Sequence, residues 1–452
     1  MHAPNAQDGP SAPTLPSLHS RRYLEILLMA AAVGVPISAV AWGYMQLVHR
    51  LQHWVYEDLP AAVGFGQTPI WWPVAPMVLA GLLVGLTVRY LPGRGGDSPA
   101  DGFHAGPPPP LRELPGIVLA TVASLGLGAV VGPEAPLIAL GAGLAARAPE
   151  AFRRGHDVQA VAVVGAAGSF AAISLLLGSP LLGAFLVMEA AAVGGTVLGL
   201  MMLPGLLAAG IGALVIIGLG SLTGLGTASL AIPGLPEYVR PDVVQFGWAV
   251  GIGLMAPFLG LAIQRLARVV RDRVGSRPVL GTSVVGLAIA GLAIAYAALT
   301  GEAPTAVLFS GELALGPLLL QAADYSVLTL VLLMVFKGLA YALSLGAFRG
   351  GPVFPGMFLG AAGGVALSHL PGLPTVAGAA MGIAAMCVVM LRMPLVSVLL
   401  ATLLLSQGLA LMPLVIVAVV VAHVLTAYLA RAGTAAGPAA PGAVGRTQVQ
   451  PS

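Results

Sequence analysis

Long apolar runs recur along almost the whole chain, and they constrain its fold more than any other feature. A helix needs about 20 apolar residues to cross a bilayer core of ~30 Å. Charged residues are only 8% of 452, too few to wet a globular surface of this size, where about a quarter is usual. Since lipid offers the backbone no hydrogen bonds, such runs must form helices. The sequence therefore predicts an all-α polytopic membrane protein. Its apolar runs lie at 23–49, 73–92, 112–130, 159–177, 181–193, 197–220, 244–267, 279–299, 325–345, 376–391, 394–409 and 413–430.

Some apolar stretches are too short to cross a membrane. We expect short helical pieces at 98–103, 134–147, 305–321 and 354–369. Backbone is interrupted at membrane depth only where protein or a watery cavity surrounds it. The pattern is thus typical of a transporter bundle of many tilted and broken helices.

Basic residues gather in short hydrophilic stretches, which predicts orientation. The positive-inside rule places such stretches in the cytoplasm, so we expect an integral, multi-pass cell-membrane protein with both termini cytoplasmic. The net charge of +3 then reflects topology, not nucleic-acid binding. Polar or Ala/Gly/Pro-rich tails at 1–20 and 432–452 are expected to be disordered. The basic residues concerned are Arg21, Arg22, Arg265, Arg268, Arg271, Arg273, Arg277 and Arg431.

An internal repeat divides the apolar region. The segment 132–142 resembles 351–361, which begins 219 residues later, and 179–186 resembles 393–400. Two Pro-led helix starts in nearly the same register predict two similar membrane repeats, 21–220 and 221–431. In inverted-repeat transporters the substrate site lies where the repeats meet.

Both copies of the first repeated segment begin with Gly-Pro, at Gly132 and Gly351. Proline suits the first turn of a helix, and glycine lets backbone approach a ligand closely. Each copy therefore predicts a helix that starts inside the membrane, with free N–H groups and a positive dipole end that attract an anion. We expect backbone around Gly132, Ala135, Gly351, Val353 and Phe354 to bind a small inorganic anion, chloride first.

Glu134 stands at the start of the first of these helices. A carboxylate at membrane depth is costly and is a functional candidate by default. It can occupy the place of an anion, and it can yield that place when it is protonated or displaced. We predict that Glu134 is a gate; the alternative is a carboxylate that only caps a helix.

These motifs resemble those of the CLC family of chloride channels and chloride/proton exchangers. Gly132–Pro136 is similar to the family's Gly-Lys/Arg-Glu-Gly-Pro motif, and Gly351–Pro355 to its Gly-x-Phe-x-Pro motif. The flanking segments 337–346, 357–361, 165–168 and 180–189 also read like family sequence. The resemblance covers roughly 20–431. It implies an inverted-repeat helical fold, a homodimer and one anion pathway per subunit.

The chain departs from the family at several motif positions. The family's first anion motif falls at Gly95–Pro99, where Ser98 can supply a hydroxyl to the anion, and Asp97 is expected to cap a short helix. Pro352 lacks an N–H that the family uses. Val353 replaces the family's Phe, for which Phe354 can substitute.

Two further family positions concern protons and the inner barrier. Family exchangers relay protons through an inner glutamate, but here Glu189 keeps the preceding position and Ala190 fills the relay position. We therefore expect Glu134 and at most Glu189 on a proton pathway, and transport that is passive or weakly proton-coupled. The family's inner tyrosine falls near Leu425; Tyr428, one turn away, is an anion ligand or an interfacial tyrosine.

Alternative functions remain open at this point: a chloride/proton or fluoride/proton antiporter, or a secondary transporter of another solute. An intramembrane enzyme is disfavoured because no nucleophile–base pair, phosphate loop or metal-ligand spacing appears, and no cofactor is expected.

Glu302 and Glu312 are expected to face an aqueous loop. The nearly uncharged stretches 181–193, 199–218, 394–409 and 413–430 are the expected homodimer interface in the lipid bilayer.

Overall fold

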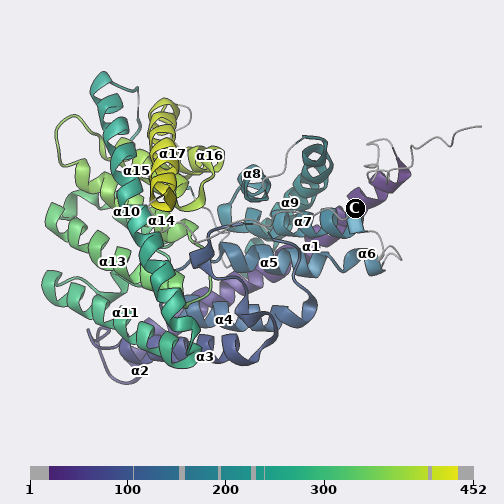
Figure 1. Cartoon of the computed structure of the whole chain (residues 1–452), viewed down its shortest axis with the longest axis horizontal. Coiled ribbons are helices and arrows are strands. Elements are labelled where there is room, and N and C mark those ends of the chain that lie inside the picture. The colour runs from purple at the N-terminus through teal and green to yellow at the C-terminus, as the bar shows by residue number, and fades with distance from the viewer. Residues whose placement is uncertain are drawn as a thin grey trace, which may run out of the picture.

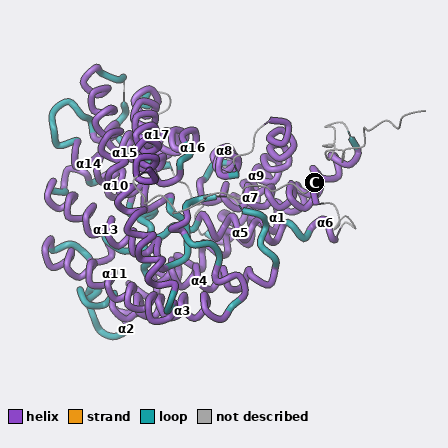
Figure 2. Tube along the Cα trace, viewed as in Figure 1, coloured by secondary structure: helices purple, strands orange, loops and turns teal. Residues whose placement is uncertain are grey.

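The computed structural model describes residues 20–104, 106–151, 158–191, 195–224, 231–238, 240–405 and 410–435. Helices make up most of this described part, which contains no strand (Figure 2). One isolated antiparallel bridge joins Gly132 to Gly351. The predicted tails lie almost wholly outside the described residues.

The first half of the chain contains three helices that are long enough to cross a membrane and several short ones. A π-helical turn, η1 (Trp54–Asp58), follows the first helix. The 3-10 turns η2 (Pro92–Gly95), η3 (Pro99–Asp101) and η4 (Leu111–Glu113) join the third helix to the fourth. The helices are α1 (Arg21–His53), α2 (Leu59–Ala62), α3 (Val74–Tyr90), α4 (Leu114–Leu127), α5 (Glu134–Ala145), α6 (Ala148–Ala151), α7 (Val158–Leu177), α8 (Pro180–Ala190) and α9 (Gly195–Thr223).

The second half repeats this mixture of long and short helices. The 3-10 turns η5 (Pro304–Ala306) and η6 (Ala322–Asp324) lie before and after the shortest helix of this half. The helices are α10 (Val243–Gly275), α11 (Pro278–Thr300), α12 (Leu315–Leu320), α13 (Val327–Ala347), α14 (Val353–Leu367), α15 (Thr375–Leu391), α16 (Pro394–Leu404) and α17 (Met412–Ala435).

Several helices are built to face lipid. Seven in the described part are long and apolar enough to cross a membrane, and five shorter apolar helices accompany them. Large apolar side chains are exposed along the long helices, for example Leu28 (62%), Phe258 (63%) and Val424 (62%). This confirms the predicted integral membrane protein.

The two halves pack their helices in the same order. In the first half α1 packs on α7 and α9, and α5 packs on α7; in the second, α10 packs on α15 and α17, and α14 packs on α15. Figure 1 shows α5 to α9 on one side of the molecule and α10 to α17 on the other. Helices α3 and α11 pack against each other. The predicted repeat bundle of tilted and broken helices is confirmed.

Glycine pairs permit the closest of these helix contacts. A Cβ added at Gly141 or Gly168 would overlap the carbonyl of the other residue, between α5 and α7. Gly360 and Gly382 face each other in the same way between α14 and α15. Small residues let helix backbones approach closely within lipid, and here they do so for α5 on α7 and for α14 on α15.

Two predicted helical pieces are wrong. The stretch 98–103 contains only the single turn η3, and 305–321 is divided into η5, an irregular loop and α12. Phe309 (φ 61°) and Gly311 (φ 86°) lie in the left-handed region, which ends a right-handed helix. The loop that contains Phe309 and Gly311 leads into α12 and lines a cavity of the site described below.

Candidate functional site

The two Gly-Pro turns meet at the centre of the molecule. The N–H of Gly132 donates to the carbonyl of Gly351 (2.7 Å), and the N–H of Gly351 donates to the carbonyl of Gly132 (2.6 Å). Directly after the bridge α5 begins at Glu134 and α14 begins at Val353. The structure therefore brings two helix N-termini to one place, as the repeat predicts.

The bridge changes the role of the two glycines. Their N–H groups are used by each other's carbonyls, so neither is free to donate to an anion, contrary to the expectation for Gly132 and Gly351. The two glycines instead leave room for the Glu134 carboxylate, because a Cβ on either residue would overlap it. The first-turn N–H groups of each helix, which lack partners within the helix, remain the backbone donors.

Each turn is also held by a serine from the opposite half. The hydroxyl of Ser344 on α13 accepts from the N–H of Val130 (3.0 Å), and the hydroxyl of Ser124 on α4 accepts from the N–H of Arg349 (3.2 Å). Both serines are fully buried. Sequence analysis missed them, although they lie 220 residues apart, in the register of the repeat.

Glu134 is fully buried, and its carboxylate reaches the other half of the molecule. Oε1 accepts from the N–H of Phe354 in the first turn of α14, at 2.9 Å. Oε2 has no hydrogen-bond partner among the described residues. The carboxylate thus occupies the N-terminus of α14, where an anion is expected, and leaves one oxygen unsatisfied.

Cavities lie on both sides of Glu134. Its neighbour Pro133 lines a cavity of about 900 Å³, which we call the Glu312 cavity. Its other neighbour, Ala135, lines a cavity of about 320 Å³ together with Pro136 and Pro352, here the Ser98 cavity. A third cavity of about 640 Å³, the Gln264 cavity, shares Pro352 with it. The residues on either side of Glu134 in the sequence therefore line different cavities.

Ser98 and Asp97 both line the Ser98 cavity. Ser98 lines its cavity, and its buried Oγ has no partner among the described residues. It is also the N-cap residue of η3, without a side-chain cap bond. Asp97 is exposed and does not cap this turn, so that expectation is wrong: η3 starts one residue too late for it. Arg349, a cation that sequence analysis overlooked, lines the same cavity.

Val353, Phe354 and a tyrosine complete the start of α14. Val353 and Phe354 are both buried. The carbonyl of Pro352 accepts from the hydroxyl of the buried Tyr341 at 2.6 Å, which helps to fix the turn. Tyr341 lies within the family-like segment 337–346, but nothing in its spacing pointed to this contact.

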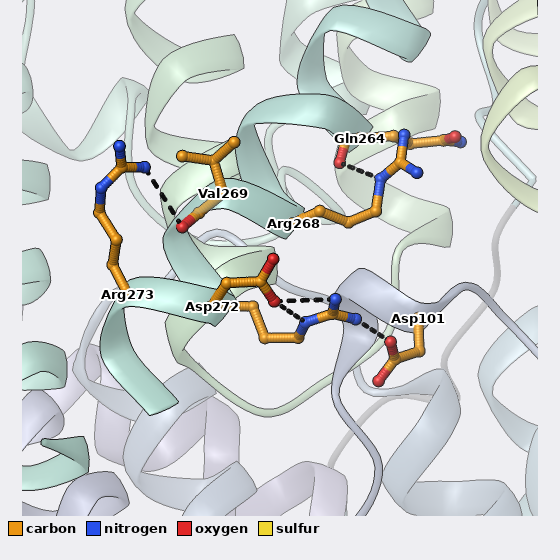
Figure 3. A network of polar contacts seen from close by, with 7 residues as sticks. Asp101, Gln264, Arg268, Val269, Asp272 and Arg273 are labelled. Carbon is orange, nitrogen blue, oxygen red and sulfur yellow. Dashed lines mark hydrogen bonds and ion pairs between the residues drawn. The ribbon is translucent and has the colours of Figure 1, made fainter. Parts of the chain in front are cut away.

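The cavities differ in charge. Arg265, Arg268 and Arg392 line the Gln264 cavity, with Asp101 as its acidic residue. Arg271 pairs with both Asp101 and Asp272 and so ties η3 to α10. Figure 3 labels these two aspartates and marks their ion pairs with dashed lines. The Glu312 cavity is acidic instead: Glu57, Glu302 and Glu312 line it, with His49 and His53. Glu302 is exposed as expected, whereas Glu312 is partly buried.

The remaining predicted site residues lie elsewhere. Both carboxylate oxygens of Glu189 accept from the first turn of α16, from the N–H groups of Leu395 (3.2 Å) and Val396 (2.8 Å). Glu189 therefore caps a helix between the halves and lines none of the three cavities. Tyr428 is 70% exposed on α17 and also lines none of them. The structure does not bring either residue to Glu134.

Known proteins resemble this chain over most of its length. The family model described as voltage gated chloride channel matches residues 80–427. The chain belongs to the CLC family. The putative ion-transport protein YfeO of Escherichia coli is 26% identical over 372 residues, 80% of this chain and 85% of the relative. The Salmonella paratyphi A protein of the same name is 34% identical over 127 residues, 28% and 31% of the two chains.

Solved CLC structures share the fold. A slow cyanobacterial Cl⁻/H⁺ antiporter superposes with a TM-score of 0.70 and 20% identity, over 93% of this chain and all of that one. A CLC-type fluoride/proton antiporter gives 0.66 and 21%, over 90% and 97%. This chain is thus a CLC-family anion-transport protein of the membrane and not an enzyme.

Proposed function

We propose that this CLC protein moves small inorganic anions, chloride first, along one path per subunit that Glu134 gates. The carboxylate of Glu134 on the N-terminus of α14 is the observation that carries the proposal. The path runs from the Gln264 and Ser98 cavities, past the Gly132–Gly351 bridge, to the Glu312 cavity.

Competition for one place explains the gate. As an anion, Glu134 benefits from the N–H of Phe354 and the positive end of α14. When protonated it loses most of that benefit, and an arriving anion can replace it. The unpartnered hydroxyl of Ser98 and the first-turn N–H of Ala135 then supply further donors toward the Ser98 cavity. Such partial charges bind an ion weakly enough to release it.

We propose that proton coupling is weak. Ala190 cannot carry a proton, and Glu189 is engaged as the cap of α16. The fold is shared with Cl⁻/H⁺ and fluoride/proton antiporters, so coupled exchange of chloride or fluoride is the second candidate.

We further propose a homodimer with cytoplasmic termini. The arginines around the Gln264 cavity support a cytoplasmic location for that side, because the positive-inside rule favours basic residues there. Helices α8, α9, α16 and α17 present apolar side chains outward that a second copy would cover. These include Leu181 (58%), Leu214 (71%), Ile217 (57%), Leu395 (49%) and Val420 (52%). Single-molecule photobleaching in bilayers tests this; a protein that bleaches only in single steps contradicts it.

Anion flux from proteoliposomes tests the gate. Wild-type flux should rise as the pH falls, whereas Glu134→Ala and Glu134→Gln should make it fast and insensitive to pH. Wild-type pH dependence in Glu134→Ala would show that Glu134 is not the gate. The reversal potential under combined chloride and pH gradients separates the two candidates. A passive path follows chloride alone, and a coupled one moves with the pH gradient.

A further inference from the structure

Three arginines line the Gln264 cavity, and they come from two elements that meet there. Arg265 and Arg268 lie on α10, three residues apart and so on neighbouring positions of the helix surface. Arg392 lies directly after α15. Gln264 joins the two elements, because its Nε2 donates to the carbonyl of Val389 near the end of α15 at 3.0 Å. This hydrogen bond therefore helps to bring Arg392 to the cavity that the other two arginines line.

The positive charge of these arginines is not balanced by carboxylates of the cavity. In the described part of the chain, none of the three forms an ion pair. Asp101, the acidic residue of the lining, pairs with Arg271, which does not line the cavity. Arg268 donates from Nε to the carbonyl of Gln264 at 3.3 Å (Figure 3), and its two Nη groups have no partner among the described residues. The cavity therefore offers guanidinium groups that can donate to an anion.

The backbone at Arg392 is the observation that points to a ligand. Arg392 adopts φ 60°, in the left-handed region that a residue with a Cβ rarely occupies. It directly precedes the repeated segment 393–400, and its counterpart before 179–186 is Gly178, with φ 62°. Glycine is the usual residue for such a turn at the end of a helix. The first half thus makes the turn without strain, whereas the second half has a strained backbone that places a cation beside the cavity.

We propose that the Gln264 cavity binds a phosphate group, held by the guanidinium groups of Arg265, Arg268 and Arg392. A guanidinium presents its N–H groups in a planar fork that fits the paired oxygens of a phosphate. A halide has no paired oxygens, and a cavity of about 640 Å³ has the size of a small-molecule site. Basic pockets between membrane helices on the cytoplasmic side also bind lipid headgroups. The phosphate therefore belongs to a soluble cytoplasmic compound or to an anionic lipid.

A phosphate in this cavity obstructs the anion path on that side. Pro352 lines both the Gln264 cavity and the Ser98 cavity, so the bound group stands on the branch of the path that leads to the gate. This consequence rests on the proposed transport function, whereas the binding itself does not.

Calorimetric titration of inorganic pyrophosphate into the purified protein, in phosphatidylcholine nanodiscs, tests the site directly. Arg392→Gly removes one cation and gives the turn the residue that the first half uses, so its thermal stability should equal or exceed that of wild type. Its affinity for pyrophosphate should fall about tenfold or more, because hydrogen bonds between charged groups are strong. Arg265→Gln should weaken binding to a similar extent.

Arg273→Gln is the matched control. Arg273 belongs to the same basic end of α10, but it donates to the carbonyl of Val269 (Figure 3) and does not line the cavity. Its loss should change the affinity for pyrophosphate less than about twofold. Equal weakening by Arg273→Gln and Arg392→Gly would mean that pyrophosphate meets only a generally basic surface, and this outcome overturns the site. Absence of saturable binding to wild type overturns it as well.

Two further arms identify the source of the phosphate and separate the site from the transport function. Phosphatidic acid added to the nanodiscs competes with pyrophosphate if a lipid headgroup reaches the cavity, and leaves binding unchanged if the ligand is soluble. In proteoliposomes, pyrophosphate on the side of the arginines should slow chloride flux in wild type but much less in Arg392→Gly. Saturable binding by a protein that carries no anion flux contradicts the proposed function alone. Anion flux without saturable binding contradicts the phosphate site alone.

Discussion

The Gly-Pro turns at Gly132 and Gly351 have similar backbones and different side chains. They bond each other, each leads into a buried helix, and each is held by a serine of the other half. However, the first helix begins with Glu134 and the second with Val353. The two halves thus each supply a helix N-terminus that attracts an anion. Only the first half supplies a carboxylate, Glu134, and this carboxylate occupies the N-terminus of the other half's helix.

Gly351→Ala tests directly whether Glu134 has to occupy the N-terminus of α14. The added Cβ would overlap Oε2 of Glu134, and the backbone there does not need glycine for a left-handed φ. The carboxylate must leave the α14 N-terminus. We expect flux at alkaline pH to rise about tenfold or more, which corresponds to about 1.4 kcal/mol of lost gate stabilisation.

Two controls accompany Gly351→Ala. Gly316→Ala, whose Cβ would meet nothing within 4 Å, should behave like wild type. In Glu134→Ala the overlap is absent, so adding Gly351→Ala should change flux little. An unchanged pH curve for Gly351→Ala alone would mean that the carboxylate does not have to occupy this position.

Lys337 on α13, a fully buried cation whose Nζ donates to the four carbonyls of the loop at residues 306–309, marks a second asymmetry. The position 220 residues earlier is the buried Ile117, so the first half has no such cation. Lys337→Met leaves four carbonyls without their donor and should lower the free energy of unfolding by on the order of 3 kcal/mol. Thermal unfolding in detergent measures the loss. Lys337→Arg keeps a cation and should lose less; equal stability of Lys337→Met and wild type would show that the loop does not depend on the ammonium.

Local features were predictable from the sequence because they depend on nearby residues. Apolar length predicted the helices, and Gly-Pro predicted the two starts at Gly132 and Gly351. Contacts between distant segments were not predictable. Glu189 caps α16, 205 residues further along, and Ser124 and Ser344 cross between the halves. Glu312 was expected in an aqueous loop because neither Lys337 nor the bend at Phe309 shows in a hydropathy pattern.

Ser124 and Ser344, which each bond a turn of the opposite half, test the features that the two turns share. Ser124→Ala and Ser344→Ala each leave one backbone N–H of a central turn without its partner. Each should lower the free energy of unfolding by about 1–2 kcal/mol. Since the turns are bonded to each other, the double variant should deviate from additivity. Clearly unequal single losses, measured by thermal unfolding, would contradict an equivalent role for the two serines.

The smallest effect is expected at the ion pair that ties η3, and with it Ser98, to the end of α10. Arg271 pairs with Asp101, which lines the Gln264 cavity, but the two side chains are 33% and 50% exposed. Exposed pairs contribute about 0–1 kcal/mol and are screened by salt. Asp101→Asn should therefore change flux by less than about twofold, and high salt should erase the difference. Asp272→Asn removes the other carboxylate beside Arg271 and leaves the tie intact, so it is the matched control. A tenfold loss of flux in Asp101→Asn alone, with normal thermal stability, would instead mean that this pair fixes the position of Ser98 in the anion path.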